Sequence, residues 1–314
     1  MPQALDRRLI AVKPITVPTT GRGVHRDIER GTERGIPLQV KVTAPADGTD
    51  LPVLVFSHGN AWSMDGYGPL VDRWAAAGFV VVQPTHLDSR RHGIGLDDPR
   101  FRTIWRVRIA DLHAVLDTLD DVLEQVPELP TRVNAGRVAV VGHSWGGQSA
   151  AALLGARVLD AEGTPGEDFT HPSVTAGALI ATTGTGDTLT PFALEHLPFM
   201  RPDYTGMTTP ALVIAGGEDR SAMSTRGPDW FTDAYHLSPA PKRLLIIADG
   251  EHTLGGVAGE AVRETSDEDP ERVALVADAV AAYLLDVLGG DSTAWQDLHE
   301  RAAAGSAAFS IEGK

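Results

Sequence analysis

Short apolar runs are spaced along the chain, with longer stretches of a different periodicity between them. The run at 38–44 alternates apolar and polar positions, which is typical of a strand with one buried face. The other runs are nearly continuous in Val, Ile, Leu and Ala, at 53–56, 79–82, 138–141, 178–181, 211–215 and 244–248. Continuous apolar runs of this length predict strands buried on both faces, as in a mostly parallel sheet.

Between these runs, apolar residues recur every three or four positions, which is the spacing of an amphipathic helix. Leu70, Val71 and Trp74, for example, fall on one face of a helical segment. Helices are predicted at 67–77, 109–126, 148–159 and 271–288. The alternation of strands and helices predicts an α/β fold with a mostly parallel sheet flanked by helices, formed as a single domain over 1–314.

Two longer stretches interrupt this alternation. Residues 86–105 are polar and contain several arginines, and residues 182–210 mix Gly, Thr and Pro with apolar side chains. Loops of this length are often functional, so we expect both to form a cap over a site, with ordinary surface loops as the alternative. A tail at 290–314 follows the last long helix, and we expect it to be helical.

The clearest chemical signal is the sequence Gly-His-Ser-Trp-Gly at 142–146, between an apolar run and an Ala-rich segment. It matches the pattern G-x-S-x-G, which between a strand and a helix is typical of a nucleophile elbow. Gly142 and Gly146 leave room for the sharp turn from which Ser144 would project. The chain has no cysteine, so a thiol nucleophile is excluded. His143 is expected to be structural.

A serine hydroxyl is a weak nucleophile and needs a general base that is oriented by an acid. His252 and Asp219 each come just after an apolar run. Because catalytic groups gather beyond the carboxyl ends of parallel strands, we expect both residues beside Ser144. Glu218 is the second candidate for the acid, and Asp187 is the third.

An oxyanion hole needs two backbone amides aimed at one point. The first is expected from Trp145, the residue after the nucleophile. The second is expected from Asn60 in the loop His-Gly-Asn-Ala-Trp at 58–62, with Ala61 as the near alternative. His58 is expected to brace this loop.

Together these residues resemble the α/β-hydrolase superfamily, over about 38–288. More narrowly, Phe-Ser-His-Gly at 56–59, the segment 74–82, Pro84 and His86 are similar to the group of chlorophyllases and platelet-activating-factor acetylhydrolases, to which dienelactone hydrolases are related. The resemblance implies an α/β-hydrolase fold and a cofactor-free, esterase-like or lipase-like enzyme. Such an enzyme would cleave a small-molecule carboxylic ester or lactone through an acyl-enzyme.

Large apolar side chains in the loops near the expected nucleophile are candidates for the substrate pocket. Ligand sites are mostly apolar clefts, although any single aromatic residue is more often part of the core. The candidates are Trp62, Met64, Tyr67, Trp105, Phe192 and Phe199, with Met200 beside them.

Charge and composition narrow the functional classes. With 27 Lys and Arg against 42 Asp and Glu, the formal net charge is -15, so the basic footprint of a nucleic-acid-binding protein is lacking. The sequence has no P-loop pattern and no obvious cluster of metal ligands, so we expect no cofactor and no metal. We expect no transmembrane segment and a cytoplasmic location, because no long apolar run occurs at the N-terminus or elsewhere.

Other functions on the same fold stay open at this point. A lyase, a perhydrolase or a transacylase uses a similar triad, and a catalytically silent binding protein is a further alternative. The oligomeric state and the acyl and alcohol specificity do not follow from the sequence.

Overall fold

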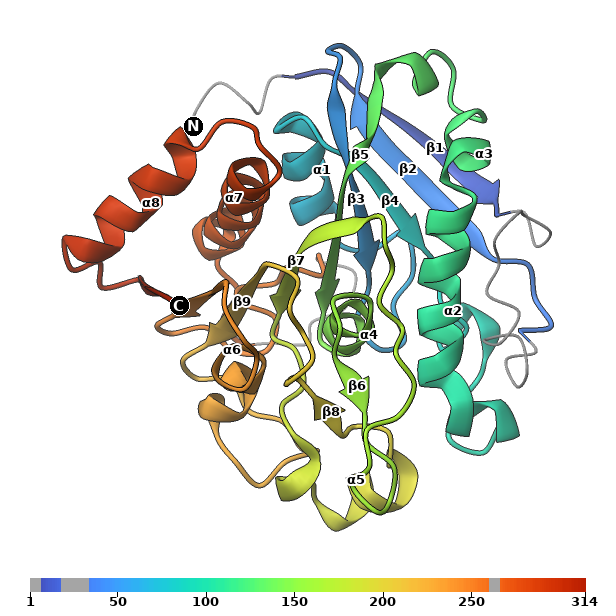
Figure 1. The fold of residues 1–314 in the computed structure, drawn as a ribbon, viewed down its shortest axis with the longest axis vertical. Coiled ribbons are helices and arrows are strands. Elements are labelled where there is room, and N and C mark those ends of the chain that lie inside the picture. Colours follow the sequence, from blue (N-terminus) through green and yellow to red (C-terminus); the bar gives the residue numbers. More distant parts are fainter. Residues whose placement is uncertain (1–6, 18–33, 260–265) are drawn as a thin grey trace.

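The computed structural model describes residues 7–17, 34–259 and 266–314, and its centre is a twisted sheet of nine strands (Figure 1). The strands are β1 (Leu9–Thr16), β2 (Gln39–Pro45), β3 (Leu51–Ser57), β4 (Val80–Pro84), β5 (Val133–His143), β7 (Val174–Ile180), β9 (Ala211–Gly216), β10 (Lys242–Ile247) and β11 (Phe309–Gly313). Their order across the sheet is β1-β2-β4-β3-β5-β7-β9-β10-β11. A separate antiparallel pair consists of β6 (Arg157–Val158) and β8 (Pro202–Asp203).

The strands from β4 to β10 in this order run parallel, and β1, β2 and β11 add antiparallel edges. Alternate side chains of β3 enter two different cores: Val53 and Val55 face one, and Leu54 and Phe56 face the other. Because β3 and β4 are buried along their whole length, the continuous apolar runs of the sequence are explained.

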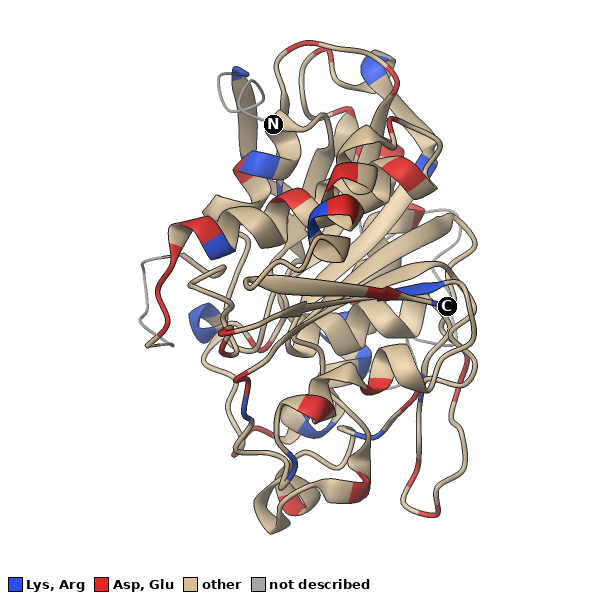
Figure 2. Ribbon diagram, turned by 90° about the vertical axis from the view of Figure 1, so that its left-hand side faces the viewer, with Lys and Arg blue, Asp and Glu red and all other residues tan. Residues whose placement is uncertain are grey.

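Helices cover both faces of the sheet (Figures 1 and 2). They are α1 (Gly68–Ala76), α2 (Ile104–Asp117), α3 (Leu119–Leu123), α4 (Trp145–Leu153), α5 (Pro191–His196), α6 (Asp233–His236), α7 (Pro270–Val287) and α8 (Thr293–Ala303). Apolar residues of α1, α7 and α8 pack on one face, and those of α2, α3 and α4 pack on the other. The predicted α/β fold, with a mostly parallel sheet flanked by helices, is therefore confirmed.

Some element boundaries differ from the prediction. The single helix expected at 109–126 is divided into α2 and α3 at Thr118, whose hydroxyl donates a hydrogen bond to the Ala114 carbonyl at 2.7 Å. The helix expected at 148–159 ends early, because Gly155 adopts a φ of +110° and turns the chain into β6. The tail is helical only in α8 and then forms β11 along β10.

A third apolar cluster lies at the carboxyl ends of the parallel strands, around Trp145. It receives Ile94 and Phe101 from the first of the two longer stretches, and Leu197 and Met200 from the second. The first stretch contains two short 3-10 turns, and the second contains α5 and β8. Within the described ranges, no helix is long and apolar enough to cross a bilayer.

Candidate active site

The turn between β5 and α4 holds Ser144 in a strained backbone conformation. Its φ is 56° and its ψ is -122°, a combination that residues other than glycine rarely adopt. A Cβ at Gly142 would lie 2.0 Å from the Gly146 carbonyl oxygen, and one at Gly146 would lie 2.0 Å from that of Ser57. The two glycines are thus required by close backbone packing, and this packing presents Ser144 at the start of α4.

Ser144, His252 and Asp219 form a continuous hydrogen-bonded chain. The distance from His252 Nε2 to Ser144 Oγ is 2.9 Å, and that from His252 Nδ1 to the nearer Asp219 oxygen, Oδ2, is 3.0 Å. Asp219 is fully buried beyond β9, and His252 follows β10. Burial raises the pKa of Asp219, and the hydrogen bond with His252 opposes that shift. This arrangement lets His252 take a proton from the hydroxyl while Asp219 fixes its tautomer.

The other candidate acids lie elsewhere. Glu218 is exposed, and its backbone amide donates to the Gly250 carbonyl. Asp187 is also exposed and accepts a hydrogen bond from Thr185 Oγ1 at 2.5 Å. Among the residues that the structure describes, Asp219 is the carboxylate that hydrogen-bonds to His252.

A second hydrogen-bonded chain connects the loops on either side of Ser144. The Gly59 amide donates to the Tyr67 hydroxyl at 3.0 Å, and that hydroxyl lies 2.9 Å from His143 Nδ1. His143 Nε2 lies 2.9 Å from the His252 carbonyl oxygen. Burial, and secondarily the charge of His252, lowers the pKa of His143 to about 3, so its ring is neutral. Tyr67 therefore donates to Nδ1, and Nε2–H donates to the carbonyl.

The candidate oxyanion donors differ in what they already bind. The Ala61 amide donates to Asp88 Oδ2 at 3.2 Å and is occupied. The amides of Asn60 and Trp145, by contrast, have no hydrogen-bond partner in the part of the chain that the structure describes. An amide that is not engaged elsewhere is what an oxyanion hole requires.

Buried charges hold the loop that carries Asn60. Arg108 binds both oxygens of Asp88 at 2.7 Å and also contacts the His58 carbonyl. Burial acts to raise the pKa of Asp88, but Arg108, His58 and His86 together hold it below its usual value. Neither Arg108 nor Asp88 is predicted as a site residue from the sequence. The available signal was a charged residue among the apolar positions of α2, but Asp111 and His113 are buried on the same helix, so the pattern does not distinguish Arg108 from them.

Ser57, His86 and Asp111 form another serine-histidine-aspartate chain below this loop. The Ser57 Oγ to His86 Nε2 distance and the His86 Nδ1 to Asp111 Oδ2 distance are both 2.9 Å. All three side chains are buried, none lines the cavity described next, and Arg34 also binds Asp111. Because substrate has no access to Ser57, this chain supports the loop and the end of β3.

A cavity of about 530 Å³ opens in front of Ser144 and His252. Its walls come from the 58–62 loop, from both longer stretches and from the segment after β9. The lining residues include Asn60, Ala61, Trp62, Tyr67, Asp88, Arg90, Ile94, Leu96, Phe101, Thr183, Phe192, Leu197, Met200, Met223, Trp230 and Phe231.

The pocket candidates from the sequence divide into two groups. Trp62, Tyr67, Phe192 and Met200 line the cavity. The others do not, because each packs against the protein instead: Trp105 lies edge-on to Phe169, Phe199 lies edge-on to Trp145, and Met64 is buried.

Several cavity residues are absent from the sequence-based candidates. Phe101, Trp230 and Phe231 all contribute to its wall, and the Phe231 ring centroid lies 5.4 Å from that of His252. Trp230 and Phe231 belong to a 3-10 turn after β9, and this short turn has no periodic pattern that the sequence could have revealed.

Comparison with known proteins gives the family to which this chain belongs. The chain matches the Alpha/beta hydrolase family over residues 54–313 and therefore belongs to this family. It is 25% identical to Chlorophyllase-1 of Arabidopsis thaliana over 275 residues, which cover 81% of this chain and 78% of that protein. It is 28% identical to the chloroplastic Chlorophyllase-1 of Citrus unshiu over 144 residues, 44% of this chain and 41% of the relative. The expected similarity to chlorophyllases is confirmed, and the protein is a hydrolase.

Proposed function

We propose that this protein is a serine hydrolase that cleaves a carboxylic ester or lactone through an acyl-enzyme. The observation that carries the proposal is the hydrogen-bonded chain from Asp219 through His252 to Ser144, at the edge of a cavity. Membership of the hydrolase family and similarity to chlorophyllases support the same reaction type.

In the proposed reaction, Ser144 Oγ attacks the substrate carbonyl carbon while His252 Nε2 accepts the hydroxyl proton. The amides of Asn60 and Trp145 donate to the oxyanion that forms. His252 then gives the proton to the departing alkoxide, and the acyl group stays on Ser144. A water molecule, deprotonated by His252, attacks the acyl carbon. The bond from this carbon to Ser144 Oγ then breaks, His252 returns the proton to Oγ, and the acid is released, while Asp219 orients the ring throughout.

The cavity wall supports an ester with a large apolar part. Leu96 and Phe192 lie on its wall and are nearly half exposed, at 47% and 45%. They come from 86–105 and 182–210, so we propose that these two stretches form the cap over the substrate. Because the relatives are named chlorophyllases, chlorophyll belongs in the substrate screen beside simple esters, lactones and amides of increasing chain length.

The decisive experiment removes the nucleophile. Ser144→Ala is expected to lower kcat/KM for a p-nitrophenyl ester by about 10⁴-fold or more, because the covalent step is lost. A fluorophosphonate probe is expected to label the wild-type protein at Ser144 and to leave the variant unlabelled. Substantial activity in Ser144→Ala would contradict this nucleophile. A folded wild-type protein that neither reacts with the probe nor cleaves any ester would favour a binding protein instead.

A further inference from the structure

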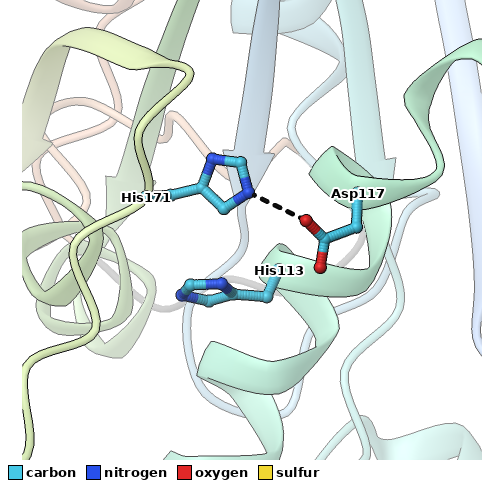
Figure 3. Close-up of side chains that lie close together, drawn as sticks. All are labelled: His113, Asp117 and His171. Carbon is cyan, nitrogen blue, oxygen red and sulfur yellow. Dashed lines mark hydrogen bonds and ion pairs between the residues drawn. The ribbon is translucent and has the colours of Figure 1, made fainter. Parts of the chain in front are cut away.

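Three side chains with metal-binding groups meet between α2 and the loop that leads into β7 (Figure 3). His113 and Asp117 lie one helical turn apart on α2, and His171 comes from the loop. One donor atom from each residue lies within 4.8 Å of the other two. Local spacing does not reveal this cluster, because His171 is 54 positions from Asp117. None of the three lines the cavity at Ser144.

Groups outside the cluster hold one nitrogen of each imidazole ring. His113 Nε2 lies 2.9 Å from the Phe169 carbonyl oxygen and donates to it, so the lone pair is on Nδ1. His171 Nδ1 accepts a hydrogen bond from the Ser173 amide at 3.3 Å and lies 2.7 Å from Ser173 Oγ, while His171 Nε2 donates to Asp117 Oδ1 at 3.2 Å. His113 has the arrangement that is usual for a metal-binding histidine, in which the second ring nitrogen donates to a carbonyl.

The cluster is largely shielded from solvent. His113 and His171 are 4% and 5% exposed, and the two rings pack edge-on with centroids 5.0 Å apart. Asp117 Oδ2 is buried and, within the described ranges, has no hydrogen-bond partner. A buried carboxylate oxygen in this situation is unfavourable unless another group or an ion approaches it.

We propose that His113, Asp117 and His171 bind a Zn²⁺ ion. Two imidazole nitrogens and one carboxylate oxygen form a donor set that Zn²⁺ prefers, and a water molecule would complete a tetrahedral site. Donor atoms at about 2.1 Å from a tetrahedral ion lie about 3.4 Å from one another. Side-chain rotations that move each donor atom by about 1 Å bring this cluster to that geometry. When Nε2 of His171 binds the ion, the ring proton moves to Nδ1. Ser173 Oγ then accepts this proton, and the hydrogen bond that Nδ1 accepts from the Ser173 amide is lost.

The bound ion would join α2 to the loop that enters β7. The same helix carries Arg108, which holds the loop of Asn60 through Asp88. The ion thus has a structural role and stabilises the helix from which the candidate oxyanion loop is supported. This inference is independent of the proposed reaction, since Ser144 and His252 take no part in the metal site.

The test measures Zn²⁺ binding by the full chain, without an affinity tag and after treatment with EDTA. Titration calorimetry is expected to show one Zn²⁺ per chain. At free Zn²⁺ about 100 times Kd, Tm is expected to rise by about 5 °C. Co²⁺ in place of Zn²⁺ is expected to give the visible absorption of a four-coordinate site.

Asp117→Asn and His171→Ala are each expected to weaken Zn²⁺ binding by at least tenfold. His196→Ala is the matched control, because His196 is an exposed histidine of α5 and its loss should leave Kd unchanged. Asp117→Asn is nearly isosteric, and near-ultraviolet circular dichroism checks that it folds. The proposal is wrong if the wild-type chain binds no stoichiometric Zn²⁺, or if both variants bind it with unchanged Kd.

Discussion

At the scale of the single residue, the structure distinguishes between Asp219 and Asp187 as candidates for the acid that orients His252. Asp219 is buried and contacts Nδ1, whereas Asp187 is exposed and contacts Thr185. Asp219→Asn should place a donor against Nδ1–H and favour the wrong tautomer. We expect kcat for ester hydrolysis to fall by about 10⁴-fold. Steady-state kinetics on a p-nitrophenyl ester measures this loss.

Asp187→Asn is the matched control for this substitution, with kcat expected to stay within about twofold because exposed substitutions away from the site change little. If Asp187→Asn costs more activity than Asp219→Asn, the acid of the triad is misassigned.

The three members of the candidate triad could be located from the sequence because each follows an apolar run that ends at the same edge of the sheet. The residues that orient them could not. Tyr67 contacts His143 over a separation of 76 positions, and the Ala61 amide contacts Asp88 over 27. Such contacts depend on how loops meet in space, and local periodicity carries no information about them.

At the scale of the element, α2 supports the candidate oxyanion loop through a buried ion pair. The Arg108 and Asp88 side chains are 1% and 0% exposed. Arg108→Ala would leave the Asp88 charge buried without its partner, so we expect the free energy of unfolding to fall by about 3–5 kcal/mol. Urea denaturation followed by circular dichroism measures the change.

Arg106 on the same helix provides the control. It pairs with Glu167 at 2.8 Å, but both side chains are more than a third exposed. Arg106→Ala is therefore expected to cost about 1 kcal/mol or less. Equal losses for the two variants would show that the buried pair has no special role in stability.

The elements with strong patterns could be predicted, and the edges of the sheet could not. Each continuous apolar run lies within or largely overlaps a central strand, because strands buried on both faces leave an unmistakable pattern. β1 and β11 are edge strands with several exposed positions, so their sequences resemble loops. α2 and α3 share one apolar periodicity. The local hydrogen bond of Thr118 between them does not alter this periodicity, so the sequence pattern does not reveal the break.

At the scale of the whole molecule, charged side chains are concentrated outside the central strands, and some are buried in pairs such as Arg108 with Asp88. Lys, Arg, Asp and Glu are concentrated on helices and loops (Figure 2), and β3, β4, β7 and β9 contain none of them. Three histidines are nevertheless buried near the candidate site: His58, His86 and His143. Burial lowers the pKa of each ring, so each stays neutral in the folded state where an unfolded chain would take up a proton.

This difference makes stability depend on pH, and His143 allows the effect to be isolated. Its pKa is about 3 in the folded chain, against about 6.5 when unfolded. Below pH 6.5 the unfolded state therefore binds a proton that the folded state does not, and this stability is lost as pH falls toward 3. The wild-type free energy of unfolding should decrease by about 1.4 kcal/mol per pH unit more steeply than that of His143→Gln. Urea denaturation between pH 6 and pH 4.5, where the unfolded histidine is mostly protonated, measures both slopes. Parallel wild-type and His143→Gln profiles would mean that His143 is not held neutral by burial.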